Sequence, residues 1–214
     1  MTILNINVRP DRVLLGMDTL VLDTIDGSHV ETSKFGVLPE ANAVVAWLGD
    51  RVLHSQIFLE CFAANIYADL DVLEPLLPQL IMERASFLRD RYAKLGAPQE
   101  FLDSPHLATV EMMMAGWSKA ANRMRCARFS LQPGDSVVGV EAIDGSRIAP
   151  WEILEPAEVV EPTSIDAIER LAKFQLAAAR RHGVADQGFG GSFLIVEITR
   201  DELRIRRRAI FPKG

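Results

Sequence analysis

The start of the chain alternates hydrophobic and polar residues and is interrupted by short turn sequences. Ile3–Val8 alternates with a period of two, and Val13–Met17 resumes the extended pattern after the Pro- and Asp-containing segment Arg9–Arg12. Two extended runs around such a break predict a β-hairpin. Ala41–Leu48 is almost continuously apolar, which indicates a strand buried on both faces. Further extended runs are predicted at Leu20–Thr24 and His29–Phe35.

The pattern then changes to the three- and four-residue spacing of amphipathic helices. Apolar residues recur at this spacing over Leu53–Ala64, which predicts one helix. A second helix is predicted over Val72–Leu95, with Gly96 as its stop. Because proline lacks the N–H that a helix interior requires, Pro75 and Pro78 are expected in its first turns or at a kink before them.

Strands return in the second half of the chain, together with a further helix. Ser164 is a suitable N-cap for a helix over Ile165–His182, and Pro150–Pro162 is expected to be irregular with a short strand. The predicted strands are Ala108–Trp117, Arg123–Leu131, Ser136–Ala142, Ser192–Thr199 and Leu203–Phe211. Since each helical group must cover a sheet face, this order predicts an α+β fold with two stacked sheets and helices outside both. A plain two-layer α+β fold is the alternative.

Composition narrows the class of protein. The 214 residues are 49% hydrophobic and 24% charged, which favours a single domain over residues 1–214. The net charge of −6 argues against a nucleic-acid partner. The basic run Arg204–Arg208 has acidic residues before it and apolar residues after it, and we interpret it as the solvated face of a strand.

Several kinds of site and location are not expected. Cys61 and Cys126 are too few for a disulfide framework, and none of the four histidines has metal-ligand spacing, so no metal is predicted. No nucleotide-binding fingerprint or serine-hydrolase elbow occurs, so no cofactor is predicted. Without a secretory signal or a membrane-length apolar run, we expect a soluble cytoplasmic protein that does not enter a membrane.

One set of residues suggests a reaction centre. Thr2 follows Met1 directly, and Asp18 and Lys34 follow at equal intervals of sixteen residues. If Met1 is removed, Thr2 carries a hydroxyl nucleophile and a free α-amine, whose pKa of about 7.7–8.0 suits a general base near neutral pH. A nearby lysine lowers the pKa of that amine by like-charge repulsion, and an aspartate holds the lysine in place.

These residues, with the order of the predicted elements, resemble the proteasome β-subunit superfamily, and most closely its bacterial heat-shock-locus protease subunit. Thr2 follows Met1 without a propeptide, Asp18 ends the second strand within LLGMDT, and Lys34 stands at the family spacing. Near the C-terminus, the segment 186–192, DQGFGGS, is similar to the family's Asp, Gly-Gly and small residue ahead of a strand. The resemblance covers residues 2–68 and 165–211, and the middle of the chain by element order.

The resemblance implies a four-layer αββα sandwich of the N-terminal nucleophile type and a role for each matching residue. Thr2 is then the nucleophile, Lys34 lowers the pKa of its amine, and Asp18 anchors Lys34. Asp186 steadies the site by hydrogen bonding near Thr2. Gly49, between a strand and a helix, offers its N–H to the developing oxyanion.

The function that the resemblance implies is a threonine peptidase that forms an acyl-enzyme on Thr2, with a peptide or protein as its substrate. It also implies a homo-oligomeric ring and an ATPase regulator as partners. The family's Gly-Ser-Gly turn before its penultimate helix has no counterpart here, and residues 159–164, VVEPTS, occupy that neighbourhood. Two alternatives stay open: a non-catalytic ring subunit, and an amidase that uses the same nucleophile.

Overall fold

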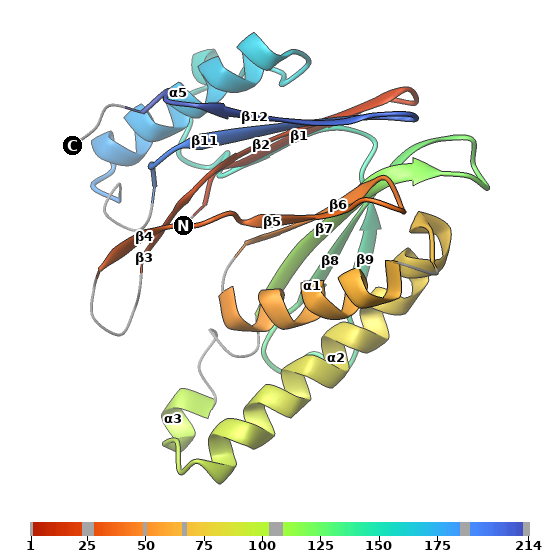
Figure 1. The fold of residues 1–214 in the computed structure, drawn as a ribbon. Coiled ribbons are helices and arrows are strands. Elements are labelled where there is room, and N and C mark those ends of the chain that lie inside the picture. The colour runs from red at the N-terminus through yellow and green to blue at the C-terminus, as the bar shows by residue number, and fades with distance from the viewer. Residues whose placement is uncertain are drawn as a thin grey trace. The chain divides into compact units, whose positions relative to one another are not determined.

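The computed structural model describes residues 2–22, 28–48, 51–65, 68–102, 109–184 and 189–211. They form α-helices and antiparallel sheets (Figure 1). The chain divides into two compact units. Unit 1 comprises residues 1–34 and 143–214, and unit 2 comprises residues 35–142. Each unit is described by itself.

Unit 1 contains a five-stranded sheet built from both ends of the chain. Its strand order is β10-β1-β2-β11-β12, and neighbouring strands are antiparallel. The strands are β1 (Leu4–Val8), β2 (Arg12–Asp18), β10 (Gly145–Ala149), β11 (Phe193–Thr199) and β12 (Leu203–Arg208). A separate two-stranded sheet pairs β3 (Leu20–Leu22) with β4 (His29–Glu31). The predicted hairpin between the first two strands is thereby confirmed.

Helix α5 (Ile165–Arg181) lies across the sheet of unit 1 (Figure 1). Ile168, Ala172 and Leu176 recur at four-residue spacing and pack with Ile3 and Phe193 in the core of this unit. The close contact is possible because β2 has a glycine at position 16, where a Cβ would clash with the Ile168 side chain of α5 and stand 2.7 Å from the Phe193 ring.

Unit 2 consists of a second five-stranded antiparallel sheet with helices on it (Figure 1). Its strand order is β5-β6-β7-β8-β9, with bounds Phe35–Leu38, Ala43–Leu48, Val110–Ser118, Arg123–Leu131 and Gly139–Ala142. Helices α1 (Arg51–Asn65) and α2 (Leu70–Lys94) pack their apolar residues against this sheet, and a short α3 (Gln99–Leu102) follows. Ala43–Trp47 of β6 are all buried, as the apolar run predicts.

Several local predictions are wrong. His29–Phe35 is not one strand: β4 ends at Glu31 and β5 begins at Phe35, because Thr32 donates its N–H to the Thr19 carbonyl and Lys34 binds Asp18. Pro75 lies in the second turn of α2, as predicted, whereas Pro78 lies deeper, in the third turn. No strand is predicted over Gly145–Ala149, but β10 forms there and pairs with β1.

The segment before α5 is largely irregular, as predicted, but the short strand predicted within Pro150–Pro162 is absent and a short 3-10 helix, η1 (Pro156–Glu158), forms there instead. In the part of the chain that the structure describes, no helix is both long and apolar enough to cross a membrane.

Candidate functional site

Asp18 is the centre of a buried hydrogen-bond network in unit 1. It ends β2 and is fully buried. Its Oδ1 atom accepts the Ile3 N–H at 2.9 Å and the Lys34 ammonium at 2.9 Å. Its Oδ2 atom accepts the Gly190 N–H at 3.2 Å. Each of these hydrogen bonds favours the negative charge of the carboxylate. One side chain therefore connects the N-terminal strand, the residue before β5 and the loop before β11.

Lys34 is almost as deeply buried as its partner. Its side chain is 4% exposed and forms an ion pair with Asp18. Burial lowers the pKa of the Lys34 ammonium from its ordinary value of 10.5, and the charge and hydrogen bond of Asp18 oppose that effect. Burial likewise raises the pKa of the Asp18 carboxyl, against the opposing effects of Lys34, Ile3 and Gly190. Lys34 therefore releases its proton more readily than an exposed lysine does.

Thr2 stands next to this ion pair. The Lys34 Nζ atom and the Ile3 backbone nitrogen are each 2.9 Å from the same Asp18 oxygen, so these two nitrogens lie less than about 6 Å apart. The Ile3 nitrogen is covalently bonded to the carbonyl carbon of Thr2. The structure thus places the backbone of Thr2 close to the Asp18–Lys34 pair and leaves Thr2 partly buried.

A turn that contains Gly190 and Gly191, called the glycine turn, precedes β11 and supplies the N–H donor to the Asp18 Oδ2 atom. Gly190 and Gly191 have φ angles of +125° and +73°, which residues other than glycine rarely adopt. A Cβ on Gly191 would also stand 2.7 Å from the Thr19 hydroxyl. That hydroxyl accepts the Ser192 N–H at 2.8 Å and donates to the Ser192 carbonyl at 3.1 Å. The turn therefore needs glycine, and Thr19 fixes it beside Asp18.

Two residues near Asp18 depart from the pattern of the proteasome β-subunit superfamily that the sequence resembles. Ile3 stands where the family usually has Thr or Ser, and Phe189 stands where it prefers a small polar residue. Both side chains are buried in the core of unit 1, at 0% and 4% exposure. Ile3 thus anchors the residue after Thr2, and Phe189 anchors the residue before the glycine turn.

Two predicted site residues, Gly49 and Asp186, lie outside the described residues, and the roles implied for them stay predictions. Ser164 is the N-cap of α5, as predicted, because its Oγ accepts the Ala167 N–H at 3.1 Å. The adjacent Thr163 carbonyl accepts a hydrogen bond from Arg12, the first residue of β2, whereas Asp18 is the last residue of that strand. Ser164 therefore does not take the place of the family's Gly-Ser-Gly serine.

The strand that runs past the start of β1 is β10. Leu4 pairs with Ala149, the last residue of β10, so the ladder between the two strands ends at the start of β1. The buried side chain of Gln175, on α5, fixes this crossing. It donates to the carbonyls of Ala149 and Pro150 and exchanges hydrogen bonds with Asn5. The end of β10, rather than the segment before α5, is the neighbour of the N-terminal strand.

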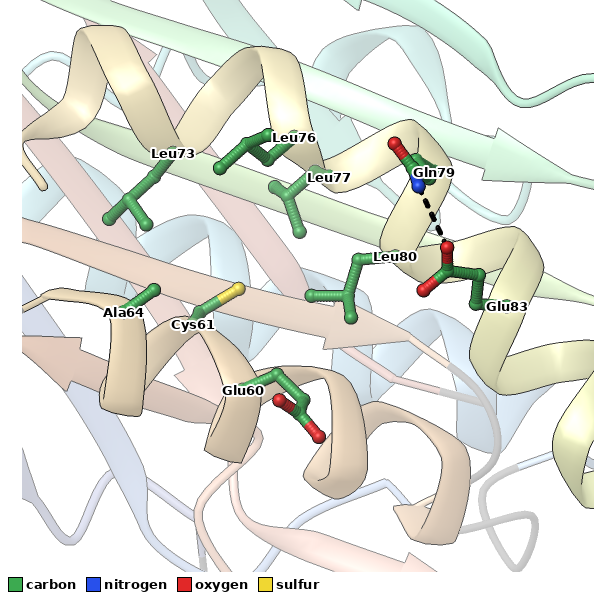
Figure 2. Close-up of a pocket in the computed structure, with 9 residues that line it drawn as sticks. All are labelled: Glu60, Cys61, Ala64, Leu73, Leu76, Leu77, Gln79, Leu80 and Glu83. Carbon is green, nitrogen blue, oxygen red and sulfur yellow. Dashed lines mark hydrogen bonds between the residues drawn. The ribbon is translucent and has the colours of Figure 1, made fainter.

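Unit 2 contains a cavity of about 250 Å³ between α1 and α2 (Figure 2). Its wall is mainly apolar, with Leu73, Leu77 and Leu80 facing Cys61. Burial raises the pKa of the Cys61 thiol to about 12, so the thiol is not a nucleophile near neutral pH. The cavity lacks the paired acid and base groups found around Asp18, and we therefore place the candidate active site at Asp18 and Lys34.

Sequence reasoning found Asp18 and Lys34 but missed the residues that hold them. Thr19, Glu31 and Arg207 contact the segment Gly190–Ser192, and no spacing rule connects the residue after β2 with β4 and β12. Within the described residues, no group of three or more His, Cys, Asp or Glu side chains could hold a metal ion.

No family model matches the chain, and no curated protein matches it. The likeness to the proteasome β-subunit superfamily therefore rests on the residues quoted above.

Proposed function

We propose that this protein is a proteasome-like N-terminal threonine hydrolase, which cleaves peptide bonds through an acyl-enzyme on Thr2 after Met1 is removed. The observation that carries the proposal is the buried Lys34–Asp18 ion pair, whose shared oxygen also accepts the N–H of the residue after Thr2. A buried ion pair is expensive to maintain. Ionisable groups with perturbed pKa values cluster at functional sites, and this pair lies beside a potential N-terminal nucleophile.

The proposed reaction uses the Thr2 residue as both nucleophile and base. The Thr2 hydroxyl oxygen attacks the substrate carbonyl, and its proton passes to the Thr2 α-amine. The Lys34 charge keeps the pKa of that amine low enough for it to be neutral beforehand. The proton then goes to the leaving amine as the peptide C–N bond breaks. Water attacks the resulting ester and releases the free acid, which restores Thr2.

The remaining parts of the proposal come from the resemblance. We propose that the two sheets form a four-layer αββα sandwich, and that the Gly49 N–H stabilises the oxyanion while Asp186 supports Thr2. A peptide or protein is the proposed substrate. A ring of identical subunits, with an ATPase regulator, is the proposed assembly.

A second candidate, a non-catalytic subunit of the same type, is favoured by one observation. Ser164 caps α5 on the side of the first residue of β2, so it supplies no hydroxyl to the Thr2 amine. In that case the Asp18–Lys34 pair would serve only to hold the N-terminal strand in place.

The deciding experiment is intact-mass analysis before and after treatment with a β-lactone, which acylates N-terminal threonines. We expect the mass to lack Met1 and to increase by one lactone. The Thr2→Ala variant should lose the adduct, while Ser164→Ala should keep it. A protein that has lost Met1 and folds normally, yet gains no adduct, would favour the non-catalytic subunit.

A further inference from the structure

The basic run of β12 is not a uniform solvated face. β12 is an edge strand of its sheet (Figure 1), and each of four arginines forms an ion pair there. The pairs are Arg204–Glu202, Arg206–Glu197, Arg207–Glu31 and Arg208–Glu169. Arg207 differs from Arg204 and Arg206 because it reaches out of its own hairpin, to the turn that precedes β11 and to β4.

Arg207 bridges two elements with the two sides of its guanidinium group. Its Nε donates to the Ser192 Oγ at 2.8 Å, and its terminal NH2 donates to the Glu31 Oε2 at 2.7 Å. Ser192 also donates to the same Glu31 oxygen, at 3.4 Å. Arg207 pairs with Leu194 in the sheet, and Ser192 lies two residues before Leu194 on the same face. The side chain therefore runs along the sheet toward the turn.

The glycine turn is consequently held from several directions. Phe189 anchors its start in the core, and Thr19 binds Ser192 from within. Arg207 and Glu31 bind Ser192 from the solvent side. The turn in exchange delivers the Gly190 N–H to Asp18. A displacement of Ser192 thus moves a donor of the buried carboxylate.

We propose that Arg207 is a positioning residue of the reaction centre: with Glu31 it clamps Ser192 and so keeps the Gly190 N–H on Asp18. The proposal rests on the proposed function for its catalytic consequence, but the clamp itself is tested without any activity.

The planar fork of arginine is what the clamp requires. An exposed ion pair by itself contributes little to stability, whereas a guanidinium that spans two acceptors fixes their separation. Lysine keeps the positive charge, but its N–H donors share one nitrogen, so it cannot hold the two acceptors at the fixed spacing of the guanidinium fork. The comparison of Arg207→Lys with Arg207→Ala therefore separates positioning from net charge.

The test is NMR of the full-length protein, with Arg204→Ala as the matched control. Arg204 lies on the same strand, is also more than half exposed and is paired with a carboxylate, but its partner is Glu202 in the adjoining turn. We expect the Gly190 amide to exchange about fivefold faster or more in Arg207→Ala and in Arg207→Lys, the change equivalent to losing a strong exposed pair. Arg204→Ala should not change this exchange.

The pKa of Lys34 in the folded protein is a second readout, and a general loss of stability does not change it. Without the Gly190 N–H, the negative charge of Asp18 is less neutralised by hydrogen bonding and interacts more strongly with the Lys34 ammonium. The pKa of Lys34 should therefore rise in both Arg207 variants. Unchanged Gly190 exchange and an unchanged Lys34 pKa in Arg207→Ala would overturn the proposal, as would equal changes in Arg204→Ala. If the wild type does not react with a β-lactone, the proposed function fails, whereas these two readouts still decide the role of Arg207.

Discussion

Asp18 and Lys34 are the two residues on which the proposed chemistry depends. Each is a charged side chain in a position where an apolar residue would be cheaper to bury. The hydrogen bonds from Ile3 and Gly190 offset part of the cost for Asp18, but not for Lys34. The ion pair therefore constrains both partners, and removing one of them leaves the other buried without its counter-charge.

This constraint gives a double-mutant prediction. Asp18→Asn and Lys34→Met should each lower the free energy of unfolding by about 3–5 kcal/mol, because each leaves a buried charge without its partner. The double variant should lose less than the sum of the two single losses, because neither charge remains. Urea unfolding at pH 7 measures all four proteins.

The exposed pair of Arg204 and Glu202 provides the control for that cycle. Arg204→Ala should leave the urea midpoint close to that of the wild type, because solvent screens this pair. Additive losses for Asp18→Asn and Lys34→Met would contradict the buried pair as the source of the coupling.

The pair also predicts a pH dependence with a definite sign. Burial lowers the folded-state pKa of Lys34 below 10.5, so between the two values the unfolded chain binds more protons than the folded one. The stability of the wild type should therefore rise with pH over this window, relative to the Asp18→Asn/Lys34→Met variant. Urea unfolding from pH 7.5 to 10.5 measures the difference, and a difference that falls with pH would show that the Lys34 pKa is raised.

At the scale of elements, α5 is the helix whose sequence best accounts for its structure. Ser164 caps its start, and apolar residues at four-residue spacing face the sheet of unit 1. Gln175 interrupts that apolar face, and it is the residue that fixes the end of β10 beside β1. Ser164 thus stabilises the start of α5, whereas Gln175 holds the end of β10 beside the N-terminal strand.

The cap gives a prediction that separates stability from chemistry. Ser164→Ala should lower the free energy of unfolding by about 1 kcal/mol, because the Ala167 N–H loses its acceptor. Ser164→Asp should restore it, because aspartate also accepts that hydrogen bond. Thermal unfolding measures the stability of both variants. A large fall in the β-lactone reaction rate of Ser164→Ala, at unchanged stability, would show that Ser164 acts at the site after all.

The α1–α2 pair predicts an unreactive thiol. Burial raises the pKa of Cys61 to about 12, and thiolate is the form that alkylating reagents attack. In a Cys126→Ala background, native protein at pH 8 should gain no iodoacetamide adduct, whereas the same protein in urea should gain one. Intact-mass analysis counts the adducts, and rapid labelling of the native protein would mean that the α1–α2 cavity opens to solvent.

At the scale of the whole molecule, the proposed ring predicts assembly. The two ends of the chain form unit 1 together, and unit 2 is the continuous segment between them. Light scattering after size-exclusion chromatography should give a multiple of the subunit mass, if the ring implied by the resemblance forms. A clean monomer at micromolar concentration would count against the ring, while leaving the chemistry of Thr2 to be tested separately.

Much of the fold was predictable from local patterns. The N-terminal hairpin, the buried β6 strand and the helix after Ser164 follow from periodicity and capping, which act between residues close in sequence. The break at Thr32–Lys34 and strand β10 were not predictable in this way. Lys34 leaves the extended path because a buried carboxylate binds it, and Gly145–Ala149 becomes a strand because β1 offers it an edge.

The sequence by itself determined which residues are available for the proposed chemistry. It contains a threonine in second position, an aspartate and a lysine at intervals of sixteen residues, and a pair of glycines at a turn whose φ angles are positive. Only the tertiary structure decided that Asp18 binds Lys34, Ile3 and Gly190 together, and that Arg207 and Glu31 hold the turn beside them. The reason is physical: hydrogen bonds and ion pairs depend on distances of about 3 Å, which folding sets between segments that sequence spacing leaves unrelated.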